Sequence, residues 1–311
     1  MILGEGGNDS LSGGAGRDVL RGGAGNDRLD GGFTGNDLFG DAGNDILIFD
    51  PQVEGLVTRS FPVSYLEGGA GRDTLRMVNE TEMEREGLIL PGFTRLSVEA
   101  GEDIHGKPNG EVEGGVSLGN VFIGDTVDAW VAGIERFEVV SDGPVQFSGF
   151  GNIIGDNEIM SGLEFVGSRS DDLIEGTPGP DRLEGKTGND HFSSNGGDRV
   201  ISDIDDEDLI SVDTGPSRYM SVADRVIITG FNGAGAAGGD EIQLGGPDTK
   251  LTATEDQAGT LISWVSASEG VTLSGSVHVD AFDLVEGIDY GPTVGLTWLQ
   301  RTVLPDYGFV A

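Results

Sequence analysis

The sequence predicts an all-β fold, a parallel β-solenoid in which short strands stack coil upon coil. Three observations predict it: a nine-residue period, glycines at fixed positions of that period, and an apolar residue that always fills its eighth position. The period is clearest in five consecutive blocks from Gly4 to Ile48, which read GEGGNDSLS, GGAGRDVLR, GGAGNDRLD, GGFTGNDLF and GDAGNDILI. Two residue classes that stay in phase over five blocks indicate a repeated structural unit rather than a chance run of glycines.

Each block is predicted to form one turn and one short strand. The glycines permit the positive φ angles of a tight turn. The last three residues form a strand whose central side chain faces the interior. Two blocks then complete one coil, and the predicted interior residues are Leu11, Leu20, Leu29, Leu38 and Leu47.

An acidic residue at the sixth position of the block predicts a metal site. Turns from alternate blocks lie on the same side of the solenoid, so Asp9, Asp27 and Asp45 should line one edge. Asp18 should line the other edge, with Asn36 or Asp37 above it because the fourth block deviates. Calcium takes six to eight oxygen ligands from carboxylates and backbone carbonyls, and two stacked turns offer both. Ca²⁺ is therefore the predicted cofactor.

The period returns twice after the first run. A single block, GGAGRDTLR, spans Gly68–Arg76 and carries Asp73 at its sixth position. A second run begins at Gly167, and an imperfect block, Ser194–Ser202, follows it with Asp198 one place early. Together the blocks predict these metal ligands: Asp9, Asp18, Asp27, Asn36, Asp37, Asp45, Asp73, Asp172, Asp181 and Asp190.

These blocks resemble the RTX, or hemolysin-type, calcium-binding nonapeptide repeats of proteins that bacterial type I secretion exports. The resemblance implies a calcium-binding β-roll, the type I secretion machinery as a partner, and an extracellular location, either in solution or associated with the cell surface. It implies a protein that folds on binding Ca²⁺ outside the cell, with a structural or interaction role. The alternative is a non-catalytic C-terminal carrier module of a secreted RTX protease, lipase or epimerase whose catalytic domain is absent from this chain. The fourth block, with Thr34 and Asn36, departs from the family pattern.

Four regions are expected along the chain. Residues 1–76 form the first β-roll block with an insert at 49–67, and residues 167–214 form the second. Residues 77–166 contain short alternating segments, which fit either an irregular continuation of the solenoid or a small β-domain beside it. Residues 215–311 form a C-terminal β cap, which covers an otherwise bare strand edge. Its last residues, Asp306–Ala311, are similar to uncleaved type I export signals, or form an ordinary final strand.

The composition limits the kinds of partner that the protein is expected to bind. The net charge of −36 disfavours nucleic acid and anionic membranes and favours divalent cations. The chain has no cysteine, which excludes disulfides and thiolate zinc sites. It has neither a visible N-terminal signal peptide nor an apolar run long enough for a transmembrane segment. Any surface or protein partner is left unspecified.

Enzyme motifs are present only as fragments, so no catalytic activity is expected. Gly115–Gly119 fits G-x-S-x-G and Gly233–Gly238 fits G-x-G-x-x-G, but strand and turn residues, not a helix, follow each. An EF-hand loop beginning at Asp203 would need Gly at its sixth position, where Asp208 stands. A catalytic site hidden in residues 77–166 is the lesser alternative. The histidines, His105, His191 and His278, are scattered.

Overall fold

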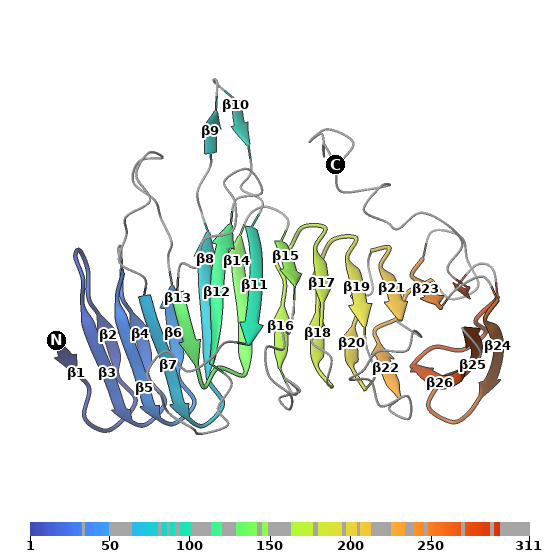
Figure 1. Cartoon of the computed structure of the whole chain (residues 1–311), viewed down its shortest axis with the longest axis horizontal. Coiled ribbons are helices and arrows are strands. Elements are labelled where there is room, and N and C mark those ends of the chain that lie inside the picture. The colour runs from blue at the N-terminus through green and yellow to red at the C-terminus, as the bar shows by residue number, and fades with distance from the viewer. Residues whose placement is uncertain are drawn as a thin grey trace.

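The computed structural model shows a solenoid of two facing β-sheets (Figure 1). It describes residues 1–32, 35–49, 64–79, 83–85, 88–90, 94–100, 113–119, 129–141, 145–148, 163–176, 180–194, 197–203, 206–212, 225–233, 239–245, 248–268, 271–286 and 289–292. All regular elements in these ranges are strands. Within them, no helix has the length and apolar character needed to cross a membrane.

The first sheet has 13 strands. In spatial order they are β1 (Ile2–Leu3), β3 (Val19–Ala24), β5 (Asp37–Ala42), β7 (Ser64–Ala70), β13 (Ala129–Ala132), β12 (Glu113–Gly119), β11 (Thr94–Ala100), β15 (Val145–Ser148), β17 (Leu173–Glu175), β19 (His191–Ser194), β21 (Leu209–Val212), β23 (Glu241–Leu244) and β27 (Tyr290–Gly291).

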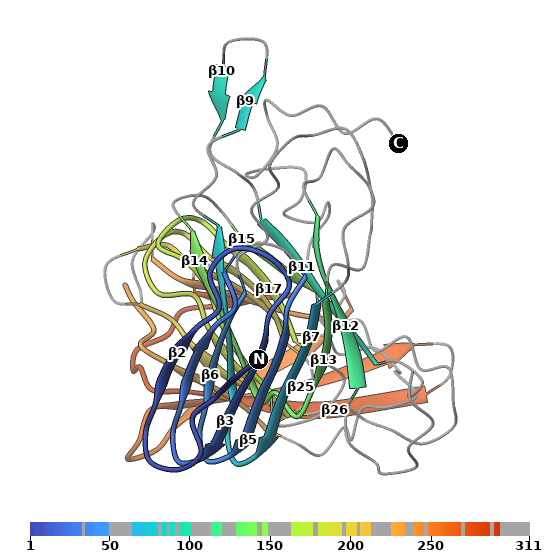
Figure 2. The same cartoon turned by 90° about the vertical axis from the view of Figure 1, so that its left-hand side faces the viewer.

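The second sheet has 12 strands. In spatial order they are β2 (Ser10–Ser12), β4 (Arg28–Asp30), β6 (Ile46–Phe49), β8 (Thr74–Asn79), β14 (Arg136–Ser141), β16 (Glu164–Val166), β18 (Arg182–Glu184), β20 (Arg199–Ile201), β22 (Val226–Thr229), β26 (Val271–Val279), β25 (Thr260–Ser268) and β24 (Lys250–Glu255). A separate antiparallel hairpin, β9 (Met83–Arg85) and β10 (Leu88–Leu90), projects from the solenoid in both views (Figures 1 and 2).

The nine-residue period sets the register of the coils, as predicted. Leu20 lies beside Leu38 in the first sheet, and Leu29 lies beside Leu47 in the second. All four leucines are buried between the sheets. We call the coils from β1 to β8 the first roll and the coils from β16 to β23 the second roll.

The regular coils are interrupted between the two rolls. β13 stacks on β7 and β14 stacks on β8, both in parallel, after the excursion that contains β9 to β12. β11 and β12 form an antiparallel pair inserted into the first sheet between β13 and β15. The core stays continuous in the second sheet, where the rings of Phe137 and Phe165 stack with centroids 5.7 Å apart.

Two boundaries differ from the sequence expectation. The insert predicted at 49–67 is shorter, because residues 64–67 form part of β7, and Leu66 pairs with Leu38 in the core. The solenoid also continues beyond residue 214, because β23 stacks on β21 and β22 stacks on β20 in the same parallel register. At that end of the second sheet, β25 pairs antiparallel with β26 and β24 pairs antiparallel with β25 (Figure 1).

Several sequence predictions fall outside the described residues or on strands. Gly115–Gly119 lies within β12, so Ser117 is a strand residue. Most of the 233–238 segment, His105, Thr34 and the segment Asp306–Ala311 lie outside the described residues.

Candidate calcium-binding site

The aspartates of the first roll form a ladder along one edge. The main-chain N–H of Asp9 donates to Oδ1 of Asp27 at 2.7 Å, and the same bond joins Asp27 to Asp45 and Asp45 to Asp73. We call these residues, Asp9, Asp27, Asp45 and Asp73, the first ladder. The edge predicted from alternate blocks is therefore present in the structure, and Asp73 extends it by one coil.

The second oxygen of each carboxylate has no protein partner. Oδ2 of each first-ladder aspartate is buried and accepts no hydrogen bond in the part of the chain that the structure describes, and the same holds for Asp18 and Asp190. Asp73 is 0% exposed and Asp27 is 2% exposed. A buried carboxylate oxygen without a partner is costly, so each of these atoms marks a place where a cation would stabilise the fold.

The glycine that opens each turn keeps space beside that oxygen. A Cβ added at Gly4 would lie 2.5 Å from the carbonyl oxygen of Gly22 and 2.8 Å from Oδ2 of Asp9. A Cβ at Gly13 would meet the carbonyl oxygen of Gly31 and Oδ2 of Asp18, both at 2.8 Å. Only glycine leaves this space free, and carboxylate and carbonyl oxygens from two successive coils converge on it.

The opposite edge of the first roll is different. Asp18 donates its main-chain N–H to Oδ1 of Asn36 at 2.8 Å, and Asn36 donates its own to Oγ of Ser64 at 3.1 Å. We call Asp18, Asn36 and Ser64 the second ladder. Of the two alternatives for the fourth block, Asn36 takes the ladder position, with its amide nitrogen bonded to the carbonyl of Gly32 at 3.2 Å. Asp37 instead pairs with Arg17 at 3.0 Å, outside the ladder.

An asparagine ladder that was not predicted from the sequence runs beside the first ladder. Asn26 donates its main-chain N–H to Oδ1 of Asn8, and Asn44 donates to Oδ1 of Asn26, both at 2.9 Å. The signal was available, because asparagine immediately precedes Asp9, Asp27 and Asp45. These bonds run in the opposite direction to those of the aspartates, so each coil of this edge is tied to the next twice.

The second roll carries two more ladders. Asp172, Asp190, Asp208 and Asp240 form the third ladder, joined by the same type of bond at 2.8, 2.8 and 2.9 Å. Asp181 and Asp198 form the fourth, with a bond of 2.9 Å across 17 positions. The block that carries Asp198 one place early is therefore accommodated without loss of the contact.

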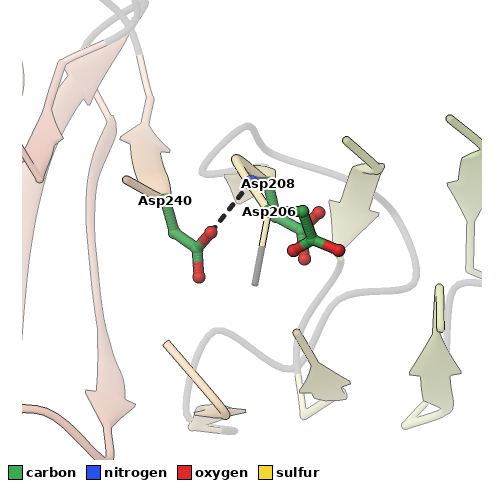
Figure 3. A group of neighbouring side chains, drawn as sticks. All are labelled: Asp206, Asp208 and Asp240. Carbon is green, nitrogen blue, oxygen red and sulfur yellow. Dashed lines mark hydrogen bonds between the residues drawn. The ribbon is translucent and has the colours of Figure 1, made fainter. Parts of the chain in front are cut away.

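The third ladder ends in a group of three carboxylates that the sequence did not predict. Asp206 joins Asp208 and Asp240, and one ligand oxygen of each lies within 4.8 Å of the others (Figure 3). Asp208 and Asp240 follow the repeats, yet each stands two residues before a core residue, Ile210 and Ile242. That spacing could have identified both, and Asp208 also lies 18 positions, two nine-residue periods, after Asp190.

Burial and crowding raise the pKa values of the ladder carboxylates. The pKa of Asp190 rises to about 9, first because of burial and then because Asp172 lies nearby. Burial likewise raises the pKa of Asp208 to about 7 and that of Asp73 to about 6. His191 is also buried, which lowers its pKa to about 4. Carboxylates in this state are stabilised by a cation or by a proton.

The donor set fits calcium. Calcium prefers carboxylate and backbone carbonyl oxygens, and the turns present both. Asp9, Asp18, Asp27, Asp45 and Asp73 would hold such ions through Oδ2, with glycine carbonyls of the neighbouring coil, and Asp190 would hold one through its own Oδ2. The ion would supply neutralising charge at each turn.

Comparison with known families agrees with this geometry. The RTX calcium-binding nonapeptide repeat matches the chain in four copies, over residues 3–37 and 166–201. The protein thus carries calcium-binding RTX repeats in two regions, which correspond to parts of the first and second rolls. A comparison with curated proteins found no match. RTX repeats are typical of secreted bacterial proteins.

Proposed function

We propose that this protein is exported unfolded by a bacterial type I secretion system and folds outside the cell when calcium fills its ladders. The observation that carries the proposal is the set of aligned, buried Oδ2 atoms without a protein partner among the described residues. In calcium-poor cytoplasm these carboxylates repel one another, and the net charge of −36 opposes compaction. Extracellular calcium modules bind at about 10⁻⁴–10⁻³ M, so the ladders fill only outside the cell.

The folded protein is proposed to have a structural or interaction role rather than a catalytic one. Support comes from the use of its acidic residues, since the repeat aspartates of both rolls are committed to ladders. Ser117, the candidate nucleophile, lies within β12 and not at a turn between a strand and a helix.

Circular dichroism of the full chain tests the calcium-dependent folding. In chelator we expect a spectrum without strand signal, and millimolar calcium should restore that signal cooperatively. Magnesium at the same concentration controls for ionic strength, because it requires a tighter octahedral shell. A strand signal that calcium leaves unchanged would sink the proposal.

A further inference from the structure

The first ladder does not end with the last nonapeptide block. The main-chain N–H of Asp73 donates to Oε2 of Glu135 at 2.7 Å, across 62 positions of sequence. The preceding bond in the same ladder, from Asp45 to Asp73, has the same length. Glu135 lies just before β14, outside both regions that match the nonapeptide repeat. A glutamate thus occupies the position that an aspartate holds in the coils below.

A shorter turn explains the longer side chain. In the preceding coil Gly68 opens the turn and Asp73 holds the ladder position five residues later. In the next coil the carbonyl oxygen of Gly133 faces Gly68, but Glu135 follows Gly133 after only two residues. The additional methylene of glutamate brings its carboxylate to the same N–H. Both coils remain in register, because Leu75 still pairs with Phe137.

An oxygen without a partner points into the space between these two turns. Oδ2 of Asp73 is buried and accepts no hydrogen bond in the part of the chain that the structure describes. A Cβ added at Gly68 would lie 2.7 Å from that oxygen and would also meet the carbonyl oxygen of Gly133. The space is therefore lined by oxygens of both coils, as in the nonapeptide turns.

The nearest arginines in sequence are engaged elsewhere. Arg72 and Arg136 precede and follow the ladder residues Asp73 and Glu135, and both guanidinium groups bind Glu164, at 2.5 and 2.6 Å. The Glu164 side chain is only 5% exposed and also accepts Arg182 at 2.8 Å. Among the described residues, no ion pair joins an arginine or lysine to Asp73 or Glu135. The two carboxylates therefore face each other without a protein cation from that part of the chain.

We propose that a calcium ion binds between the Gly68–Asp73 turn and the Gly133–Glu135 turn, held by the two carboxylates and the carbonyl oxygen of Gly133. This inference rests on the proposed calcium-dependent folding and extends it to a site outside the nonapeptide repeats. The ion fastens β14 onto β8 and so closes the long excursion that contains β9 to β12. Closing a loop of this length has an entropic cost, which the ion offsets.

Counting bound calcium in the full chain tests the site. We would measure stoichiometry by equilibrium dialysis on the wild type and on Glu135→Gln, which can still accept the Asp73 N–H but carries no charge. The expected result is one ion fewer in Glu135→Gln. Glu286→Gln, which removes an exposed charge in the C-terminal region, is the matched control and should keep the wild-type count. An unchanged count in Glu135→Gln overturns the inference.

Asp27→Asn separates this inference from the proposed function. If Asp27→Asn loses an ion and Glu135→Gln does not, the inference is wrong and the calcium ladders stand. If the wild type binds no calcium, both are wrong. Should Glu135→Gln fail to fold, anomalous scattering from calcium in crystals of the wild type decides: a peak beside Asp73 and Glu135 supports the site, and its absence there overturns it.

Discussion

The two rolls share a core but differ in how their carboxylates are satisfied. In the first roll Oδ2 of each first-ladder aspartate has no protein partner among the described residues. In the second roll serine hydroxyls bind several of the ladder carboxylates: Ser168 donates to Asp172 at 2.9 Å, Ser194 to Asp198 at 3.1 Å, and Ser202 to Asp208 at 2.6 Å. The nine-residue period therefore specifies the stacking of the coils, while the residues around each acid decide how much the turn needs a cation.

Removal of a core leucine should cause the largest loss of stability, and the loss should be the same in both rolls. Leu29→Ala and Leu183→Ala each remove a side chain that is 0% exposed, at equivalent positions of the second sheet. Each should destabilise the calcium-loaded protein by about 2–5 kcal/mol, because a buried leucine is replaced by a cavity. Chemical denaturation in saturating calcium measures the loss. A clear difference between the two variants would show that the cores are not equivalent.

Replacement of a ladder aspartate by asparagine should lower stability more in the first roll than in the second. Asp27→Asn removes the charge from a carboxylate whose Oδ2 has no protein partner among the described residues, so the variant should lose about 1.4–2.7 kcal/mol of stability at calcium 10–100 times Kd. Asp172→Asn should lose less, because Ser168 already donates to that carboxylate from its hydroxyl and its main-chain N–H. The measurement is the free energy of unfolding at calcium concentrations that fold the wild type, from the lowest of these to saturation. In chelator both variants should be unfolded like the wild type, and equal losses in calcium would contradict the comparison.

Sequence alone predicted what the period encodes. The inward leucines and the alignment of Asp9, Asp27 and Asp45 follow directly from blocks of constant length. Glu135 and Asp240 were missed because the turns before them differ in length, so no multiple of nine residues links either to the preceding ladder residue. Asp208 lies 18 positions after Asp190 and was missed because the block around it lacks the glycines of the pattern. Each nevertheless stands two residues before a buried apolar residue, Phe137, Ile210 or Ile242. The pair formed by an acidic residue and the buried apolar residue two positions later is thus kept in coils where the rest of the nine-residue block is not.

The partners of the carboxylates could not be predicted in this way. The hydroxyl of Ser202 lies within hydrogen-bond distance of both Asp208 and Asp240, at 2.6 and 2.8 Å, and these two residues lie in successive coils. Such a contact depends on how the coils stack in space and leaves no spacing in the sequence. The same holds for Glu164, whose three arginine partners come from widely separated segments.

As the pH falls, the ladder carboxylates of the second roll should become protonated at a higher pH than those of the first roll. Burial raises the pKa of Asp190 to about 9 and that of Asp73 to about 6, both from 3.8. Without calcium, a raised pKa means that the folded state holds a proton more tightly than the unfolded chain. The stability that this bound proton contributes is fully present below pH 3.8 and is lost as the pH rises through the pKa of the folded state.

Calcium reverses this dependence, because the ion needs the ionised carboxylate. Between about pH 8 and pH 7 the affinity of the Asp190 site should fall by up to about tenfold, equal to about 1.4 kcal/mol, whereas the Asp73 site should change little until the pH approaches about 6. Calcium titrations of the wild type and of Asp190→Asn at several pH values check this. Asp190→Asn should have a flatter pH profile in this range, and an unchanged slope would assign the dependence to another group.

The smallest expected change in stability concerns the second ladder of the first roll, in which Asn36 replaces an aspartate. Asn36→Asp places a carboxylate oxygen where the amide nitrogen now lies, 2.7 Å from the Cβ position at Gly31. The second ladder would then carry two successive carboxylates, that of Asp18 and the one introduced by the substitution, and should bind one more ion. At calcium about five times Kd the gain is about 1 kcal/mol, provided that the lost bond from the amide to Gly32 is offset by the ion.

The sign of this effect should change with calcium. At the lowest calcium concentration that folds the wild type, where the added site is still empty, Asn36→Asp should be destabilising because it adds an unpartnered charge. The free energy of unfolding is therefore measured for the variant and the wild type there and in saturating calcium. Ser64 continues the second ladder with a hydroxyl and no charge, which limits the gain to a single ion. A gain of two ions, or none, would contradict this view of the edge.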